Sequence, residues 1–241
     1  MYKKLKTSFW ENVFNILDFY HQNRIVNFLK PLQIDKVIDV GSHKGEFLSY
    51  ILKLKNVKKI FAFEPQIAIY KVLSKKFTHK KIKIFNLAID KEISKKYIYI
   101  NKFTNTSTLS EFNKKSFYLK FKNLLTGSKK NFLYKYIVKT NTIDNLFINI
   151  KLKNTLLKID VEGFEINVLK GSEKKIVDEI DYILIENQFL NLYKKTSSKK
   201  NHDFLIKNNF EIYKNFIHPL MIFSDCLYKK KKLNKLFIIN L

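Results

Sequence analysis

Short apolar runs rich in β-branched residues alternate with helix-like segments along most of the chain, and this alternation most constrains the fold. Each run has the length of a buried strand, and each intervening segment is long enough for a crossover helix. The expected strands cover residues 36–40, 60–63, 82–89, 155–160 and 182–186, and the expected helices cover 47–54, 67–77, 164–170 and 199–208. Right-handed crossovers then predict an α/β fold with a mostly parallel central sheet and helices on both faces.

Three segments depart from this alternation. Phe9, Val13, Ile16, Leu17 and Tyr20 recur at helical spacing, so residues 8–29 are expected to form an amphipathic helix, with residues 1–30 as an N-terminal helical cap. Strands at 97–100 and 136–140 predict a β-hairpin-type insertion within residues 91–154. We expect this inserted region to lie on the side of the active site where the substrate that accepts the transferred group binds. Segments 210–216 and 236–241 are expected to pair as terminal strands. We find no convincing linker, so residues 1–241 are taken as one domain.

The chain is strongly basic, with 46 Lys+Arg against 21 Asp+Glu and a formal charge of +25. Arg24 is the single arginine, although arginine is the preferred residue for bidentate contacts to phosphate and guanine. The lysines are spread along the whole chain, which favours a composition bias over a nucleic-acid face. We therefore expect no specific nucleic-acid partner, while attraction to an anionic membrane surface or a phosphorylated substrate stays open.

Cysteine usage and apolar run lengths bear on the cellular compartment. Cys226 is the single cysteine, so an intrachain disulfide is excluded and a reducing compartment fits. Polar residues interrupt the N-terminal segment, and no run approaches the roughly 20 apolar residues that cross a bilayer. We expect a cytoplasmic protein without an export or membrane segment.

A glycine loop follows the first expected strand, in the sequence Val37-Ile38-Asp39-Val40-Gly41-Ser42-His43-Lys44-Gly45. Gly41 allows a sharp turn and close approach of a ligand, and Gly45 lets the next helix pack near the strand. The spacing differs from the dinucleotide pattern G-x-G-x-x-G. An acid two residues before the glycine suits a cationic cofactor, and S-adenosylmethionine fits. We expect Asp39, Gly41, Ser42 and Gly45 to contact it.

The next two strand ends predict the rest of the cofactor site. Glu64 ends the second strand, where a carboxylate can accept hydrogen bonds from both ribose hydroxyls. The alternative is an acid that stabilises the start of the helix after Pro65. Asn86 and Ala88 lie at the end of the third strand, where an adenine would bind, although a core role for Ala88 is equally natural.

The segment from Leu157 to Gly171 carries the most specific chemistry, because Asp160 and Glu162 follow a strand and precede a glycine turn and a helix. Glu186 ends the next strand. Acids at neighbouring parallel strand ends converge on one edge of the sheet, and stability alone rarely explains such a cluster. We expect Asp160 to act as general base or as ligand of a divalent cation such as Mg²⁺, with Glu162 supporting either role. Glu162 could instead be a helix-start charge, and Lys158 could simply pair with an acid.

These segments resemble the FkbM-type S-adenosylmethionine-dependent methyltransferases. The matching strings are VIDVGSHKGEF, FAFEP, NLAID, TNTIDNL, LLKIDVEGFEINVLKGSE and ILIEN, in order over about residues 36–190. The resemblance implies a class I Rossmann-like methyltransferase fold. It also implies that Asp39, Gly41, Gly45 and Glu64 hold S-adenosylmethionine, and that Asp160 and Glu162 face the reaction. The chain departs from the family at Ser42-His43 and Gln66-Ile67, which affects the details of cofactor contact.

Several family members act on hydroxyl groups, so the expected function is O-methylation of a hydroxyl, in a sugar or glycan precursor or another small molecule. Residues 101–136 combine hydroxyl-rich, aromatic and lysine positions that suit a sugar or an anionic acceptor, or alternatively form an exposed hairpin. Two other functions stay open. The charge suggests an RNA methyltransferase, and the same fold could serve a non-catalytic binding protein.

Overall fold

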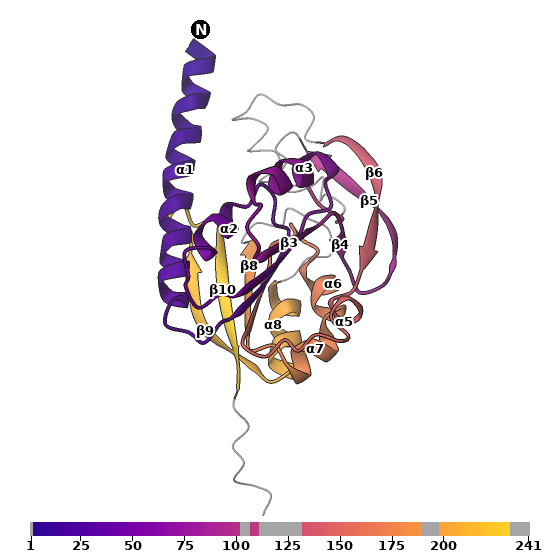
Figure 1. Ribbon diagram of the computed structural model, residues 1–241. Helices are drawn as coiled ribbons and strands as arrows, with labels where there is room; N and C mark the ends of the chain where they lie inside the picture. The colour runs from indigo at the N-terminus through magenta and orange to yellow at the C-terminus, as the bar shows by residue number, and fades with distance from the viewer. Residues whose placement is uncertain (1, 102–106, 111–131, 189–197, 232–241) are drawn as a thin grey trace, which may run out of the picture.

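The computed structural model describes residues 2–101, 107–110, 132–188 and 198–231, and seven strands form its main sheet (Figure 1). Their order is β3-β2-β1-β7-β8-β10-β9. The bounds are β1 Lys36–Val40, β2 Lys59–Phe63, β3 Ile82–Phe85, β7 Thr155–Ile159, β8 Tyr182–Gln188, β9 Phe210–Ile217 and β10 Phe223–Lys230. The first five in this order are parallel, and β10 is antiparallel to both neighbours. The expected α/β fold with a mostly parallel sheet is confirmed.

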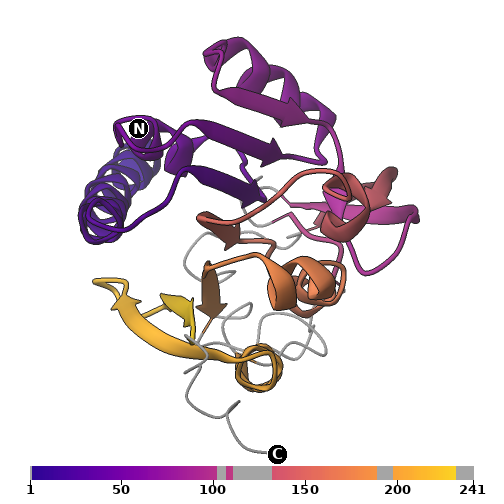
Figure 2. The same cartoon turned by 60° about the horizontal axis from the view of Figure 1, so that its bottom comes forward.

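Helices cover both faces of this sheet. Their bounds are α1 Tyr2–Leu29, α2 Glu46–Ile51, α3 Ile67–Lys76, α5 Ile143–Leu146, α6 Glu165–Lys170, α7 Glu173–Asp178 and α8 Ser198–Lys207. In Figure 2, α1 lies on the opposite side of the sheet from α6, α7 and α8. Two apolar clusters fill the two interfaces, one including Ile25 and Leu156, the other including Leu157 and Leu205. Alternate residues of β7 thus serve opposite faces, as strand geometry requires.

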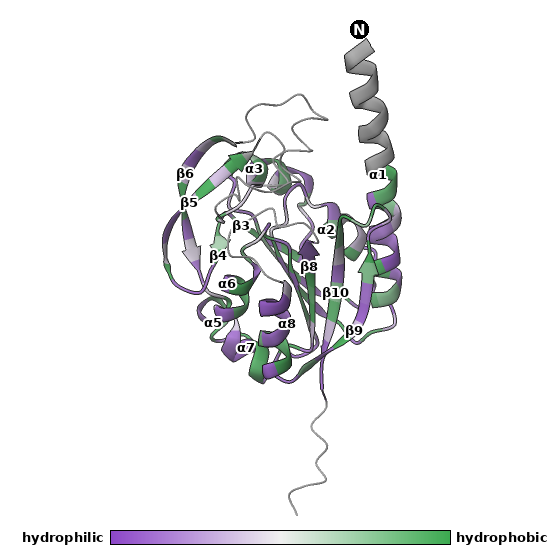
Figure 3. Ribbon diagram, turned by 180° about the vertical axis from the view of Figure 1, so that it is seen from behind, coloured by the Kyte–Doolittle hydropathy of each residue, from purple (hydrophilic) through white to green (hydrophobic). Residues whose placement is uncertain are grey.

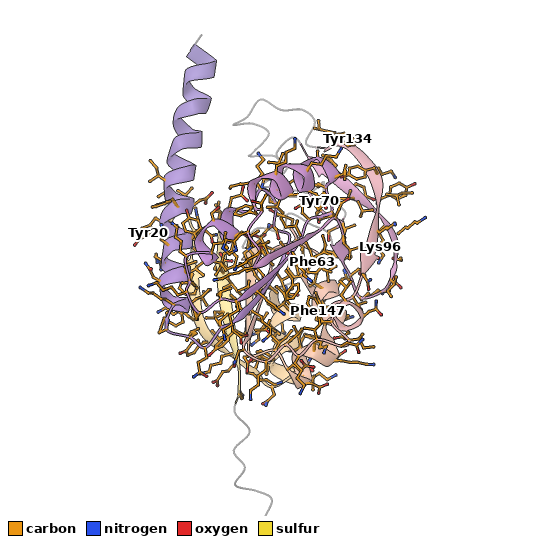
Figure 4. All side chains as sticks on the ribbon, in the orientation of Figure 1. Tyr20, Phe63, Tyr70, Lys96, Tyr134 and Phe147 are labelled. Atoms are coloured by element: carbon orange, nitrogen blue, oxygen red, sulfur yellow. The ribbon has the colours of Figure 1, made fainter. Side chains whose placement is uncertain are left out.

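A second sheet carries the insertion. It has the order β4-β6-β5, with β4 Ala88–Ile89, β5 Ser94–Asn101 and β6 Phe132–Asn141. β5 and β6 are antiparallel, so the expected hairpin-type insertion is present, and both strands are longer than predicted. Figure 4 places Tyr134 at the surface on this sheet, and Phe63 and Phe147 in the interior between the main sheet and α5.

Two local features differ from the prediction. The expected third strand at 82–89 is split between the two sheets, because the chain turns at Asn86, whose amide donates to the carbonyl oxygens of Glu64 and Pro65. β9 pairs with β10, a strand that was not predicted, and segment 236–241, its expected partner, lies outside the described residues. β10 was not predicted because Ser224 and Asp225 interrupt its apolar pattern in the sequence, although both residues are buried.

Helix α1 begins earlier than predicted and packs through other residues. Ile25, Val26 and Leu29 are buried against the sheet, whereas Ile16 and Tyr20 are 66% and 56% exposed. In the C-terminal half of this helix, hydrophobic and hydrophilic residues alternate along the ribbon (Figure 3), and the N-terminal part of the helix extends past the rest of the molecule (Figure 1). Among the described residues, no helix combines the length and apolar character needed to span a membrane.

Candidate active site

The loop after β1 is shaped by two glycines with positive φ. Gly41 has φ +86°, and a Cβ there would lie 1.8 Å from the backbone oxygen of Asp160. Gly45 has φ +78°, and its Cβ would lie 2.2 Å from the ring of Phe77, at the end of α3. Glycine is therefore required at both positions. Gly41 lets this loop pass directly beside Asp160, which follows β7, while Gly45 lets α2 approach α3.

Glu64 ties the first two loops together at the end of β2. Its carboxylate accepts hydrogen bonds from the backbone N–H of His43 at 2.9 Å and of Gln66 at 2.7 Å. Burial raises the pKa of Glu64 to about 7, although these hydrogen bonds oppose the rise. A carboxylate offers about four acceptor positions, and the side chain of Gln66 also donates to it, so about one position remains for a ribose hydroxyl.

A pocket lies between the two sheets, with an open volume of about 520 Å³ that includes its solvent-filled mouth. Its lining contains the predicted residues Gly41, Glu64, Ala88, Asp160 and Glu162, together with His43, Gln66, Leu87 and Thr108, among others. The other predicted cofactor residues, Asp39, Ser42, Gly45 and Asn86, are not among the lining residues. Ser42 donates to the backbone oxygen of Asp39 at 2.9 Å and closes the turn. Direct contact of these four residues with a cofactor stays a prediction.

Lys158 is the buried cation at the centre of the site. Its ammonium lies 2.8 Å from Asp160 and 3.8 Å from Asp39, with the ring of Phe47 at 5.3 Å. Burial alone would lower the pKa of Lys158, but the nearby carboxylates, led by Asp160, raise it above its ordinary value. Asp39 is fully buried, and this desolvation raises the pKa of its carboxyl despite the charge of Lys158. The lysine thus links the loop after β1 to the acid after β7.

Three acids converge at the carboxyl ends of β7 and β8. One carboxylate oxygen from each of Asp160, Glu162 and Glu186 lies within 4.8 Å of the others. The turn at Glu162, with φ +55°, and at Gly163, with φ +89°, turns the chain sharply at this point. The side-chain amide of Gln188 donates to Glu162 and to Glu186. Burial and the charges of Asp160 and Glu162 raise the pKa of Glu186 well above its ordinary value.

Sequence comparison agrees with this geometry. The family model for the methyltransferase FkbM domain matches residues 39–229. The chain belongs to the FkbM methyltransferase family. Membership supports the expected enzyme class, an S-adenosylmethionine-dependent methyltransferase, and so implies that cofactor. No curated protein matches the sequence significantly.

Solved structures support the class I methyltransferase fold of this FkbM chain. A methyltransferase FkbM from Methylobacillus flagellatus superposes with a TM-score of 0.53 at 15% identity, over 82% of this chain and 44% of that one. A Listeria monocytogenes protein assigned as an S-adenosylmethionine-dependent methyltransferase has a TM-score of 0.50 at 9% identity, over 90% of this chain and 99% of that one. This chain thus spans less than half the length of the Methylobacillus protein.

The residues present fit the cofactor that the FkbM family implies. Glu64 keeps acceptor capacity toward the pocket, and the acids beyond it suit a positively charged sulfonium. Gly41 leaves the backbone there without a side chain. When bound, S-adenosylmethionine supplies an activated methyl group. Leu87, Ala88 and Ile89 add an apolar wall, as expected for the adenine side.

The second Glu of the D-V-E-G-F-E string in this FkbM chain supports the turn. Glu165 accepts a hydrogen bond from the backbone N–H of Gly163 at 2.7 Å. It is buried, and desolvation raises its pKa to about 7. Glu165 therefore holds the conformation that presents Glu162 to the cluster.

Sequence reasoning missed the part played by residues 107–110. The hydroxyl of Thr108 donates to the backbone oxygen of Glu162 at 2.6 Å, and that of Ser110 donates to the oxygen of Gly163 at 2.5 Å. The dense hydroxyl positions of this segment were the signal for it. Of the aromatic residues expected to shape acceptor choice, Phe112, Phe117, Tyr118 and Phe121 lie outside the described residues.

We expected that a divalent cation such as Mg²⁺ could bind at the site, and the acidic cluster is the observation that supports this expectation. Carboxylate oxygens are the ligands that Mg²⁺ prefers, and Asp160, Glu162 and Glu186 are close enough to share an ion. However, Lys158 already neutralises part of this charge at 2.8 Å from Asp160. Divalent-cation dependence therefore stays a prediction.

Proposed function

We propose that this chain is an O-methyltransferase that uses S-adenosylmethionine to methylate a hydroxyl group of a sugar or glycan precursor. The observation that carries this proposal is the position of Asp160. It lines the pocket directly beside Gly41 of the glycine loop. A carboxylate beside the cofactor loop is the group that hydroxyl methylation needs, because the attacking oxygen must lose its proton.

Asp160 acts as the base in this proposal. Lys158 binds its Oδ2 at 2.8 Å, and no described residue donates a hydrogen bond to its other oxygen, which is left for the acceptor hydroxyl. Asp160 would take the proton of the acceptor hydroxyl as its oxygen gains the methyl group, while the methyl–sulfur bond breaks and the sulfonium leaves as a neutral thioether. Lys158 keeps the carboxylate in place before transfer, and orientation of this kind can contribute several kcal/mol to the barrier reduction.

Glu162 and Glu186 form the acceptor side of the site. Burial and the charges of Asp160 and Glu162 raise the pKa of Glu186, and its carboxyl group can share a hydrogen bond with a second hydroxyl of the acceptor. Glu162 is fixed by Gln188 and, through its backbone, by Thr108. Adjacent acceptors and donors of this kind suit the paired hydroxyl groups of a sugar ring.

Mass spectrometry of surface glycans from cells with and without the gene tests the proposal. We expect a glycan that loses the mass of one CH₂ unit when the gene is absent. Complementation with Asp160→Asn should fail, whereas the wild-type gene should restore the mass. Unchanged glycans, together with methyl transfer to another substrate class by the purified protein, would reject the sugar acceptor.

A further inference from the structure

A buried histidine–aspartate pair joins α1 to the main sheet. His21 Nε2 lies 2.8 Å from Asp225 Oδ2, and the two side chains are 1% and 4% exposed. The ring of His21 also packs edge-on against Phe223, with ring centroids 5.5 Å apart. Since an ionised carboxylate only accepts hydrogen bonds, Nε2 carries the proton that is donated to it. A carboxylate removed from water needs such a partner.

Asp225 stands next to the acidic cluster of the site. It is the register partner of Glu186 across the antiparallel β8–β10 pair, so the two side chains lie on the same face of the sheet. Glu186 in turn lies within 4.8 Å of Asp160 and Glu162. The negative charge of Asp225 also acts on Lys158. Asp225 is therefore a further carboxylate beside this group, and it links the group to α1 through His21.

We propose that His21 and Asp225 are positioning residues of the methyl-transfer site, through which α1 sets the electrostatic environment of Glu186 and Asp160. This inference rests on the proposed function. His21 fixes the direction of the Asp225 carboxylate, and Asp225 acts on Glu186 as a neighbouring like charge. Neither residue lines the described pocket, so both act through the cluster and not on the acceptor itself.

A second pair of the same kind provides a matched control. His218, which follows β9, lies with Nε2 2.9 Å from Asp18 Oδ1, and so also joins α1 to this side of the sheet. The His218 ring is 5.2 Å from that of His21. However, Asp18 is 58% exposed at its side chain and has no strand partner in the cluster. If the pairs only dock α1, removing the charge of either aspartate should have the same effect.

The test compares Asp225→Asn with Asp18→Asn in the full chain labelled with ¹³C at glutamate carboxyl groups. The Glu186 resonance is assigned with Glu186→Gln and titrated by NMR. We expect Asp225→Asn to lower the pKa of Glu186, because one like charge is removed, and Asp18→Asn to leave it at the wild-type value. An unchanged pKa in Asp225→Asn, or equal shifts in the two variants, would overturn the inference.

Two further measurements separate this inference from the proposed function. Calorimetry with S-adenosylmethionine should give wild-type affinity for both variants, since Glu64 and Gly41 are unaltered. In complemented cells, glycan methylation should fall with Asp225→Asn and His21→Leu, and should be retained with Asp18→Asn and with His21→Gln, which keeps a donor. A wild-type protein that binds no S-adenosylmethionine would contradict the proposed function, while the Glu186 titration would still decide the link to Asp225.

Discussion

Glu64→Gln should make the folded protein more stable at pH 8 while weakening cofactor binding. Burial raises the pKa of Glu64 from its ordinary value of 4.5 to about 7. The folded wild-type protein therefore binds more protons at Glu64 than the unfolded chain between these values, and this contribution to stability is lost as pH rises to about 7. At about 1.4 kcal/mol per pKa unit, the loss amounts to about 3 kcal/mol. Glutamine does not titrate and avoids it.

The substitution also has a cost that does not depend on pH. The glutamine oxygen can accept from only one of the two backbone N–H groups, of His43 or Gln66, so one hydrogen bond worth about 1 kcal/mol is lost. The variant should thus be slightly less stable than wild type near pH 5 and about 2 kcal/mol more stable at pH 8.

Urea denaturation at several pH values between 5 and 8 measures this difference, with the exposed Glu211→Gln as the control. The other titrating groups cancel when variant and wild type are compared at the same pH. A stability difference that stays constant across the range would refute the buried, protonated Glu64. Calorimetry should show S-adenosylmethionine affinity reduced by roughly 10- to 100-fold in Glu64→Gln, and wild-type affinity should decline as pH falls below about 7, because the protonated carboxyl accepts ribose hydrogen bonds less well.

Four other substitutions or conditions test the site. Asp160→Asn should reduce the rate of methyl transfer by about 100-fold or more, while the cofactor affinity measured by calorimetry stays unchanged. Full activity of this variant would show that Asp160 is not the base. Lys158→Met should cost about 3 kcal/mol in urea denaturation, because it leaves the buried carboxylate of Asp39 and the half-buried carboxylate of Asp160 without their cation; a neutral effect would contradict this stabilising role of Lys158. Gly41→Ala should cost about 3 kcal/mol or more by the same assay, against about 1 kcal/mol for Ser42→Ala; equal costs would contradict the close approach to Asp160. RNA retention should be weak and abolished by moderate salt without sequence preference, whereas tight sequence-specific binding would support an RNA acceptor.

The strands of the main sheet were predictable where burial on both faces produces continuous apolar runs. Ile60 to Phe63 and Tyr182 to Ile185 are examples, and the parallel pairing of β2 with β1 and of β8 with β7 followed from the intervening helices. β10 was not predictable in this way, because buried Ser224 and Asp225 interrupt its apolar pattern. The buried carboxylate of Asp225 is tolerated because a distant partner, His21 from α1, pairs with it. A strand stabilised by long-range polar contacts leaves little local signal.

The site was predictable at strand ends and less so between them. Glycine and acid positions after β1, β2 and β7 located Gly41, Glu64 and Asp160 in the pocket lining. The sequence did not reveal that Asp39 is fully buried and does not line the pocket. The pattern of a strand buried on both faces does not show which of its side chains reach the pocket. Nor did the sequence reveal the hydroxyl contact from Thr108 to Glu162, which joins residues that only the tertiary fold brings together.

The charge balance of the site also constrains the acceptor. Asp39, Asp160, Glu162 and Glu186 are gathered around one buried cation, Lys158. A cationic cofactor entering beside them is attracted by this excess of carboxylates, whereas a phosphate next to the reacting hydroxyl would meet like charges in a partly dry cleft. Among the residues that the structure describes, no lysine other than Lys158 forms an ion pair with Asp39 or Asp160. We therefore expect the hydroxyl that reacts to belong to an uncharged sugar ring. Any phosphate of the acceptor should be held away from the cluster, where surface lysines can bind it.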